Sequence, residues 1–105
     1  GRLPDFNLGT ADGASADPAL ERIASGILGA SAPFTSVVNG RFKGGWITRR
    51  YGRPGTGVHA LQLEMAQSAY MDEAPPYPWD AARAGALTVV LERLVGALLA
   101  TRVGV

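Results

Sequence analysis

The sequence contains no cysteine and only one histidine, His59. Without cysteine, the chain forms no disulfide and offers no thiolate as a nucleophile or as a sulfur ligand for zinc. A catalytic zinc site generally takes three protein ligands, most often histidines together with a carboxylate. The chain therefore cannot build such a site by itself, and we expect no metal ligands within it.

Long apolar runs are also absent. Charged residues interrupt every apolar stretch before it reaches the roughly 18 to 20 residues that a membrane span needs, and Glu92 and Arg93 divide the richest one. We expect no membrane partner. The start, Gly1 to Asp5, has neither an initiating methionine nor an apolar signal core, so it resembles a processed or excised beginning. We predict a fragment of a cytoplasmic protein.

Acidic residues are missing between Glu21 and Glu64, whereas arginine and lysine recur there. Most of these cations lie in residues 39–53, hereafter the basic segment, which is also rich in glycine and aromatic residues. Such a segment can bind RNA. It can equally hold a small carboxylate, because arginine matches a carboxylate bidentately, or it can be a solvated cationic loop. The net charge of +1 does not discriminate between these interpretations.

Helical periodicity occurs in two places. Asp17 can accept backbone N–H bonds as an N-cap, Pro18 suits the first helical position, and apolar residues follow at helical spacing, which predicts a helix over 18–29. A longer apolar stripe predicts a second helix over 79–100, after a proline-rich break at 74–78.

Strand signals are fewer. The first twenty residues are small and polar and predict a loop, whereas residues 35–38 and 58–64 are the strand candidates. Helices and strands in this order indicate an α/β architecture with helices packed on a sheet. Two strands are too few for a stable sheet, so the sheet in this chain is incomplete. Either homo-oligomerisation or strands from an absent N-terminal portion complete it, and the polar opening loop favours the second.

Glu64 is the best candidate for a catalytic residue. It ends the apolar strand candidate, and ligands of open α/β sheets bind beyond the carboxyl ends of strands. A carboxylate in that place can take and return a proton, or it can simply cap the strand or pair with an arginine. His59 lies on the opposite face of the strand candidate, and we interpret it as a hydrogen-bonded core histidine rather than a metal ligand.

Three blocks of the sequence form a recognisable series. They are Leu-Pro-Asp-Phe-Asn-Leu-Gly-Thr-Ala-Asp-Gly-Ala-Ser at 3–15, Asn-Gly-Arg-Phe-Lys-Gly-Gly-Trp-Ile-Thr-Arg at 39–49, and the run 51–73 with Tyr-Gly-Arg-Pro, Gly-Val-His-Ala-Leu-Gln-Leu-Glu-Met-Ala-Gln and Tyr-Met-Asp-Glu. In this order they resemble the N-formylglutamate amidohydrolase family. The resemblance covers nearly the whole chain and is most specific over 39–73.

This resemblance implies a fold similar to that of zinc carboxypeptidases and aspartoacylases, a three-layer phosphorylase/hydrolase-like α/β fold. It also implies hydrolysis of N-formyl-L-glutamate to formate and L-glutamate, a last step of histidine degradation. Family members are much longer than this chain, and their metal ligands precede its opening loop. Residues 1–105 are therefore expected to be a single partial domain from the C-terminal part. The parent would bind zinc, whereas this chain alone would bind none and would be inactive without the missing N-terminal part.

The resemblance also implies roles for individual residues. Glu64 takes the position of the glutamate that activates the zinc-bound water in carboxypeptidase-like enzymes. The candidates for holding the carboxylates of an N-formyl amino acid substrate are Asn39, Arg41, Lys43, Arg49 and Tyr51. A small basic module that binds RNA or an acidic partner through residues 39–53 is the alternative, while the preferred interpretation includes no nucleic acid.

Overall fold

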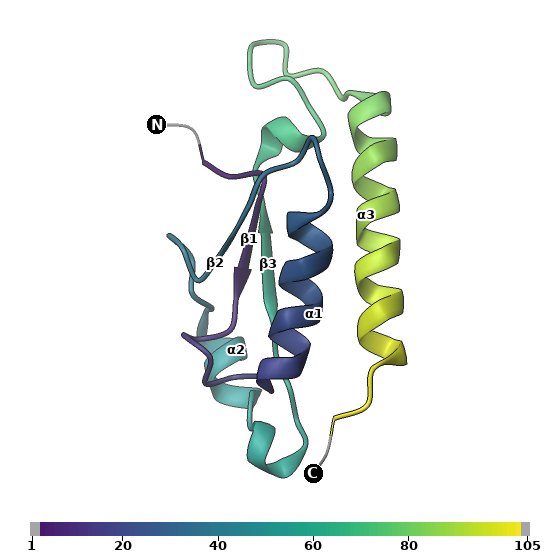
Figure 1. The fold of residues 1–105 in the computed structure, drawn as a ribbon. Helices are drawn as coiled ribbons and strands as arrows, with labels where there is room; N and C mark the ends of the chain where they lie inside the picture. Colours follow the sequence, from purple (N-terminus) through teal and green to yellow (C-terminus); the bar gives the residue numbers. More distant parts are fainter. Residues whose placement is uncertain (1–2, 104–105) are drawn as a thin grey trace.

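A computed structural model describes residues 3–103. Its centre is a three-stranded sheet with the strand order β2-β1-β3. The central strand β1 (Phe6–Gly9) runs parallel to β2 (Ser36–Val38) and antiparallel to β3 (Gln62–Met65), as Figure 1 shows. The mixed α/β class predicted from the sequence is therefore confirmed, with one strand more than expected.

The prediction of a loop over the first twenty residues is wrong for residues 6–9. Phe6 and Leu8 are 0% and 2% exposed, and Asn7 between them is also buried. Both neighbours of β1 lie far away in the sequence, so no local signal announces this strand. Its two apolar residues point to one face of the sheet because side chains alternate along a strand.

Helix α1 (Pro18–Gly29) has the predicted bounds and the predicted start. The carboxylate of Asp17 accepts a hydrogen bond from the backbone N–H of Ala19 at 2.8 Å, and Pro18 occupies the first turn. Leu20, Ala24 and Leu28 form its buried stripe. The cap and the apolar periodicity are both local, which is why the sequence predicts this helix well.

Helix α3 (Ala81–Ala100) begins close to the predicted position. Asp80 caps it by accepting a hydrogen bond from the N–H of Arg83 at 3.0 Å, and residues 74–78 contain no helix or strand. Helix α3 lies beside α1 (Figure 1) and buries an apolar stripe of Ala84, Leu87, Val90 and Leu94.

The basic segment contains a short helix, α2 (Trp46–Tyr51), which its composition did not indicate. Two 3-10 turns, η1 (Pro54–Thr56) and η2 (Gln67–Ala69), follow on either side of β3. The glycines before α2 let the chain turn sharply, since Gly44 has a φ of 122° that side chains rarely adopt.

Strand β3 is shorter than the predicted strand over 58–64. Val58 pairs in an isolated bridge with Arg53 and is half exposed, while the N–H of Ala60 donates to the carbonyl of Ser15. The predicted alternation is nevertheless correct. Leu61 and Leu63 pack against the core, whereas Glu64 is exposed on the other side.

The sheet consequently has two different faces. The core joins Phe6 and Leu8 of β1 to residues from both long helices, namely Ala24, Leu28, Leu87, Val90 and Leu94. The helices thus cover one face, hereafter the covered face, and the face that carries Asn7 is hereafter the open face. Within residues 3–103, no helix combines the length and the apolar character needed to cross a lipid bilayer.

Candidate active site

A row of side chains crosses the open face of the sheet. Asn7 of β1 is the register partner of Val37 in β2 and of Glu64 in β3. Register partners project to the same side of a sheet, so Glu64 and Asn7 are neighbours on the open face. A carboxylate and a carboxamide therefore stand side by side at the middle of the sheet.

The same face is hollowed by a cavity of about 610 Å³. Its lining comes from the start of the described chain, the three strands, the turn after β2 and the segment after β3. The residues are Leu3, Pro4, Asn7, Val37, Gly40, Arg41, Phe42, Glu64, Met65, Ala66, Gln67, Ser68 and Glu73. Of the predicted site residues, Glu64 and Arg41 both line this cavity. The charged residues of the lining are thus one cation, Arg41, and two acids, Glu64 and Glu73.

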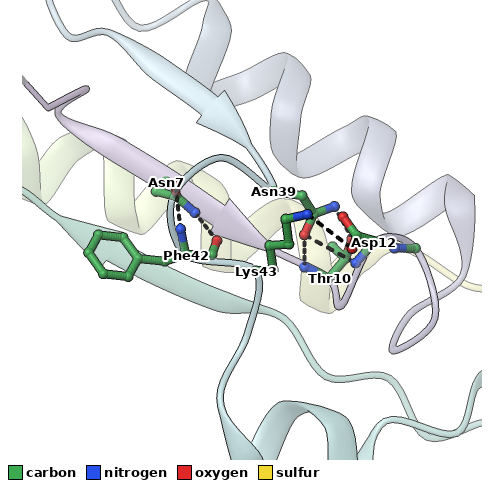
Figure 2. A network of polar contacts seen from close by, with 7 residues as sticks. Asn7, Thr10, Asp12, Asn39, Phe42 and Lys43 are labelled. Carbon is green, nitrogen blue, oxygen red and sulfur yellow. Dashed lines mark hydrogen bonds and ion pairs between the residues drawn. The ribbon is translucent and has the colours of Figure 1, made fainter.

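Asn7 fixes the turn that carries Arg41. Its side-chain Nδ2 donates to the carbonyl of Phe42, and its Oδ1 accepts from the N–H of Phe42 at 3.3 Å (Figure 2). Gly40 packs against the same group, because a Cβ there would lie 3.0 Å from Asn7 Oδ1 and 2.8 Å from a methyl of Val37. Asn7 was not identified from the sequence, although an amide between two apolar strand residues is a weak signal for such a role.

The side chain of Asn39, a predicted substrate-binding residue, forms hydrogen bonds with the turn after β1. Its Oδ1 accepts from the N–H of Thr10 at 2.8 Å, and its Nδ2 donates to the hydroxyl of Thr10 at 2.8 Å (Figure 2). Its φ of 49° lies in the left-handed region, which asparagine tolerates better than most residues. The side chain is thus committed to the turn after β1, and it does not line the cavity.

Lys43 also faces that turn rather than the cavity. Its Nζ lies 3.4 Å from Asp12 Oδ2, and its carbonyl accepts from the N–H of Ala11 at 2.7 Å. Both side chains of the ion pair are more than half exposed, so the pair adds little stability. Figure 2 shows Asn39 and Lys43 gathered at Asp12 and Thr10, apart from Asn7 and Phe42.

Arg49 and Tyr51 lie on α2 and are exposed. The ring of Tyr51 meets Trp46 edge to face at 5.9 Å, and the guanidinium of Arg50 lies 5.5 Å from the Tyr51 centroid. Neither predicted residue belongs to the cavity lining. Within the described chain, the structure thus brings Glu64 and Arg41 together and places the other candidates elsewhere.

Glu64 does not lie at the edge of the sheet that the sequence analysis predicted, where the carboxyl ends of parallel strands meet. Because β3 is antiparallel to β1, Met65 at its end lies beside Phe6 at the start of β1. The rule for carboxyl ends of parallel strands therefore does not apply to Glu64. Its side chain is exposed, accepts a 3.2 Å hydrogen bond from Nε2 of Gln62, and forms no ion pair within residues 3–103.

The hydrogen bond predicted for His59 is confirmed, although the residue is only partly buried and lies outside the core cluster. Its Nδ1 accepts from the backbone N–H of Asp17 at 3.0 Å, which ties the segment before β3 to the start of α1. The acceptor role of Nδ1 places the proton of a neutral ring on Nε2. This Nε2 is buried and has no hydrogen-bond partner in the described chain.

The residues present do not fit a zinc site. Across residues 3–103, no group of three His, Cys, Asp or Glu side chains is arranged to hold a metal ion. The one histidine is already engaged at Asp17.

The chain is thus an α/β protein whose open sheet face carries an acid and an arginine on one cavity. The family follows from comparison with known proteins. This chain belongs to the N-formylglutamate amidohydrolase family, whose model matches residues 1–71. The resemblance inferred from the sequence blocks is thereby confirmed.

Two relatives agree with this assignment, and a solved structure shares the fold. The chain is 53% identical over 100 residues to an N-formylglutamate deformylase of Pseudomonas aeruginosa and 51% identical to one of Pseudomonas putida. Each match covers 95% of this chain but only 38% of the relative. The crystal structure of an N-formylglutamate amidohydrolase from Ralstonia eutropha superimposes with a TM-score of 0.78 at 24% identity, covering 94% of this chain and 35% of that one. This last likeness concerns the fold alone.

Proposed function

We propose that residues 1–105 are part of a longer enzyme, hereafter the parent protein, that hydrolyses N-formyl-L-glutamate to formate and L-glutamate. The observation that carries this proposal is the shared cavity of Glu64 and Arg41 on the open face. The relatives at 53% and 51% identity, both N-formylglutamate deformylases, support this choice of substrate. The role in histidine degradation, the N-formyl amino acid as the small-molecule partner and the cytoplasmic location belong to the same proposal.

In this proposal Glu64 handles the proton of the reaction. Its carboxylate accepts a proton from the attacking water, whose oxygen bonds to the formyl carbon, and it returns that proton to the amine nitrogen as the C–N bond breaks. Its exposure on a cavity wall leaves it accessible to water and substrate. Arg41 binds a carboxylate of the glutamyl group, for which its planar guanidinium is suited.

The parent also supplies what this chain lacks. We propose that residues of the parent outside this chain bind zinc, that this chain alone binds none, and that it is inactive by itself. The chain spans 38% of the length of its curated relatives, and its own residues do not form a metal site over 3–103. In this proposal, the remainder of the parent protein packs against the open face of this chain. The complete domain would have the carboxypeptidase-like three-layer fold.

The alternative of a basic module for RNA or an acidic partner has no support from the comparisons. Part of its basic segment is also occupied internally, since Asn39 and Lys43 contact the turn at Thr10 and Asp12.

The test measures formate release from N-formyl-L-glutamate with added zinc. It compares this chain, the parent protein, the parent with Glu64→Gln, and the parent with Glu92→Gln as a matched control on the exposed side of α3. We expect no activity from the short chain and full activity from the parent and the Glu92 control, whereas kcat/KM of Glu64→Gln should be lower than that of the parent by about a hundredfold to ten-thousandfold. Activity of the short chain alone would overturn the fragment proposal, and full activity of Glu64→Gln would overturn the role of Glu64.

A further inference from the structure

Gln62 lies between the candidate catalytic carboxylate and the glycine-rich turn before α2. Its Oε1 accepts a hydrogen bond from the backbone N–H of Gly45 at 2.7 Å and lies 3.5 Å from the hydroxyl of Thr48. Its Nε2 donates to Oε1 of Glu64 at 3.2 Å. The two ends of one carboxamide thus connect Glu64 to the start of α2.

The orientation of this carboxamide is set by its neighbours. A backbone N–H can only donate, so the group that faces Gly45 must be the oxygen of Gln62. The NH₂ group then faces Glu64, and a carboxylate can only accept. The direction of both hydrogen bonds therefore follows from the chemistry of the groups at either end.

The anchor at Gly45 is close and specific. Gly45 precedes the first residue of α2 and has no side chain to cap that helix. A Cβ at this position would lie 3.3 Å from Gln62 Oε1, so the absence of a side chain leaves room for the carboxamide to approach the backbone. Gln62 supplies the acceptor that this N–H would otherwise lack. The carboxamide is thereby held from the side that faces away from Glu64.

We propose that Gln62 is a positioning residue for Glu64, acting as a strut that transmits the position of the turn at Gly45 to the carboxylate. The inference rests on the proposed catalytic role of Glu64. Because Glu64 is exposed and lacks an ion pair within the described chain, the hydrogen bond from Gln62 restricts the rotamers of a side chain that little else holds. A carboxylate fixed in one orientation reaches water and substrate more often in a productive geometry.

Two substitutions separate the two ends of the strut in the parent protein. Gln62→Glu keeps an oxygen acceptor for Gly45 but loses the donor to Glu64. Gln62→Met has a similar length and loses both. Each variant is also made with Glu64→Gln, which gives a double-mutant cycle. The measurements are kcat and KM for N-formyl-L-glutamate, taken on the plateau of each variant's pH profile, together with the melting temperature.

We expect both variants to lower kcat about 10-fold to 100-fold while KM changes little, because the position of the general base is lost and substrate contacts are not. Gln62→Glu should keep a melting temperature close to that of the unmodified parent. In the Glu64→Gln background, neither variant should reduce kcat much further.

A purely structural Gln62 gives a different result. Gln62→Glu would then keep its kcat, and Gln62→Met would lower the melting temperature and impair kcat equally in both backgrounds; either finding overturns the inference. If Glu64→Gln loses activity while Gln62→Met keeps its full kcat, the inference on Gln62 is overturned and the proposed role of Glu64 stands. Full activity in Glu64→Gln instead removes the proposed function on which the inference rests.

Discussion

The two faces of the sheet differ in what their residues do. On the covered face, Phe6 and Leu8 pack against helix side chains and reach almost complete burial. On the open face, Asn7 lies between them in sequence. Its side chain forms hydrogen bonds with the backbone of Phe42, and it is the register partner of the exposed Glu64. One strand of four residues thus contributes to the core and to the cavity at the same time.

This division implies that stability and chemistry can be changed separately. Burial of apolar area on the covered face supplies the main stabilising free energy. The open face is built from directed hydrogen bonds around a cavity, and its exposed residues contribute little to stability. The following substitutions test whether the two faces are separable, from the largest expected effect to the smallest.

The strongest test of the covered face is Phe6→Ala. Phe6 is 0% exposed and meets Phe34 edge to face at 5.3 Å, so truncation leaves a large cavity beneath β1. We expect a loss of about 3 to 5 kcal/mol in the free energy of unfolding, measured by urea denaturation. Val89→Ala, at a half-exposed position of α3, is the control. A similar loss in both variants would contradict the assignment of the core to this face.

Asn7→Leu tests the residue that belongs to the open face but is buried. Leucine fills a similar space and leaves the N–H and carbonyl of Phe42 without their partner. We expect a loss of about 1 to 3 kcal/mol in the free energy of unfolding. Gln67→Leu, an exposed amide on the same cavity, should stay within about 0.5 kcal/mol of the unmodified protein. Equal stability of the two variants would mean that the clamp on Phe42 is energetically unimportant.

Arg41→Gln has the smallest effect on stability and tests function on the open face alone. Arg41 is exposed, so we expect the free energy of unfolding to stay within about 0.5 kcal/mol. If Arg41 binds a substrate carboxylate, KM of the parent should rise roughly tenfold, or about 1.4 kcal/mol of binding free energy. Arg93→Gln on α3 is the charge-matched control. An unchanged KM for Arg41→Gln, or an equal rise in both variants, would exclude that role.

The sequence predicted the parts of the fold that local chemistry determines. Helix α1 follows from the cap at Asp17 and the proline after it, and both signals lie within the element itself. Strand β1 has no such signal, because its pairing partners at 36–38 and 62–65 are distant. The start of β3 was misplaced for a similar reason, since Val58 and Ala60 bond to residues outside the sheet.

The candidate site shows the same limit. Glu64 and Arg41 stand out as a lone acid and a cation in a glycine-rich segment, and the fold brings them to one cavity. The contacts of Asn39 with Thr10 and of Lys43 with Asp12 could not be predicted, because both depend on the conformation of the turn after β1. The connecting role of Gln62 was equally hidden, although alternation does place it on the same face as Glu64.

The central position of β1 has a consequence for synthesis on the ribosome. Its first partner, β2, becomes available early, together with the connecting helix α1. Its second partner, β3, and the covering helix α3 emerge only later in translation. Until then, the edge of β1 that pairs with β3 is unpaired, and the apolar side chains of Phe6 and Leu8 are covered only in part. The nascent chain is therefore open to association with other chains. A strand near the beginning of this segment is therefore secured by residues near its end.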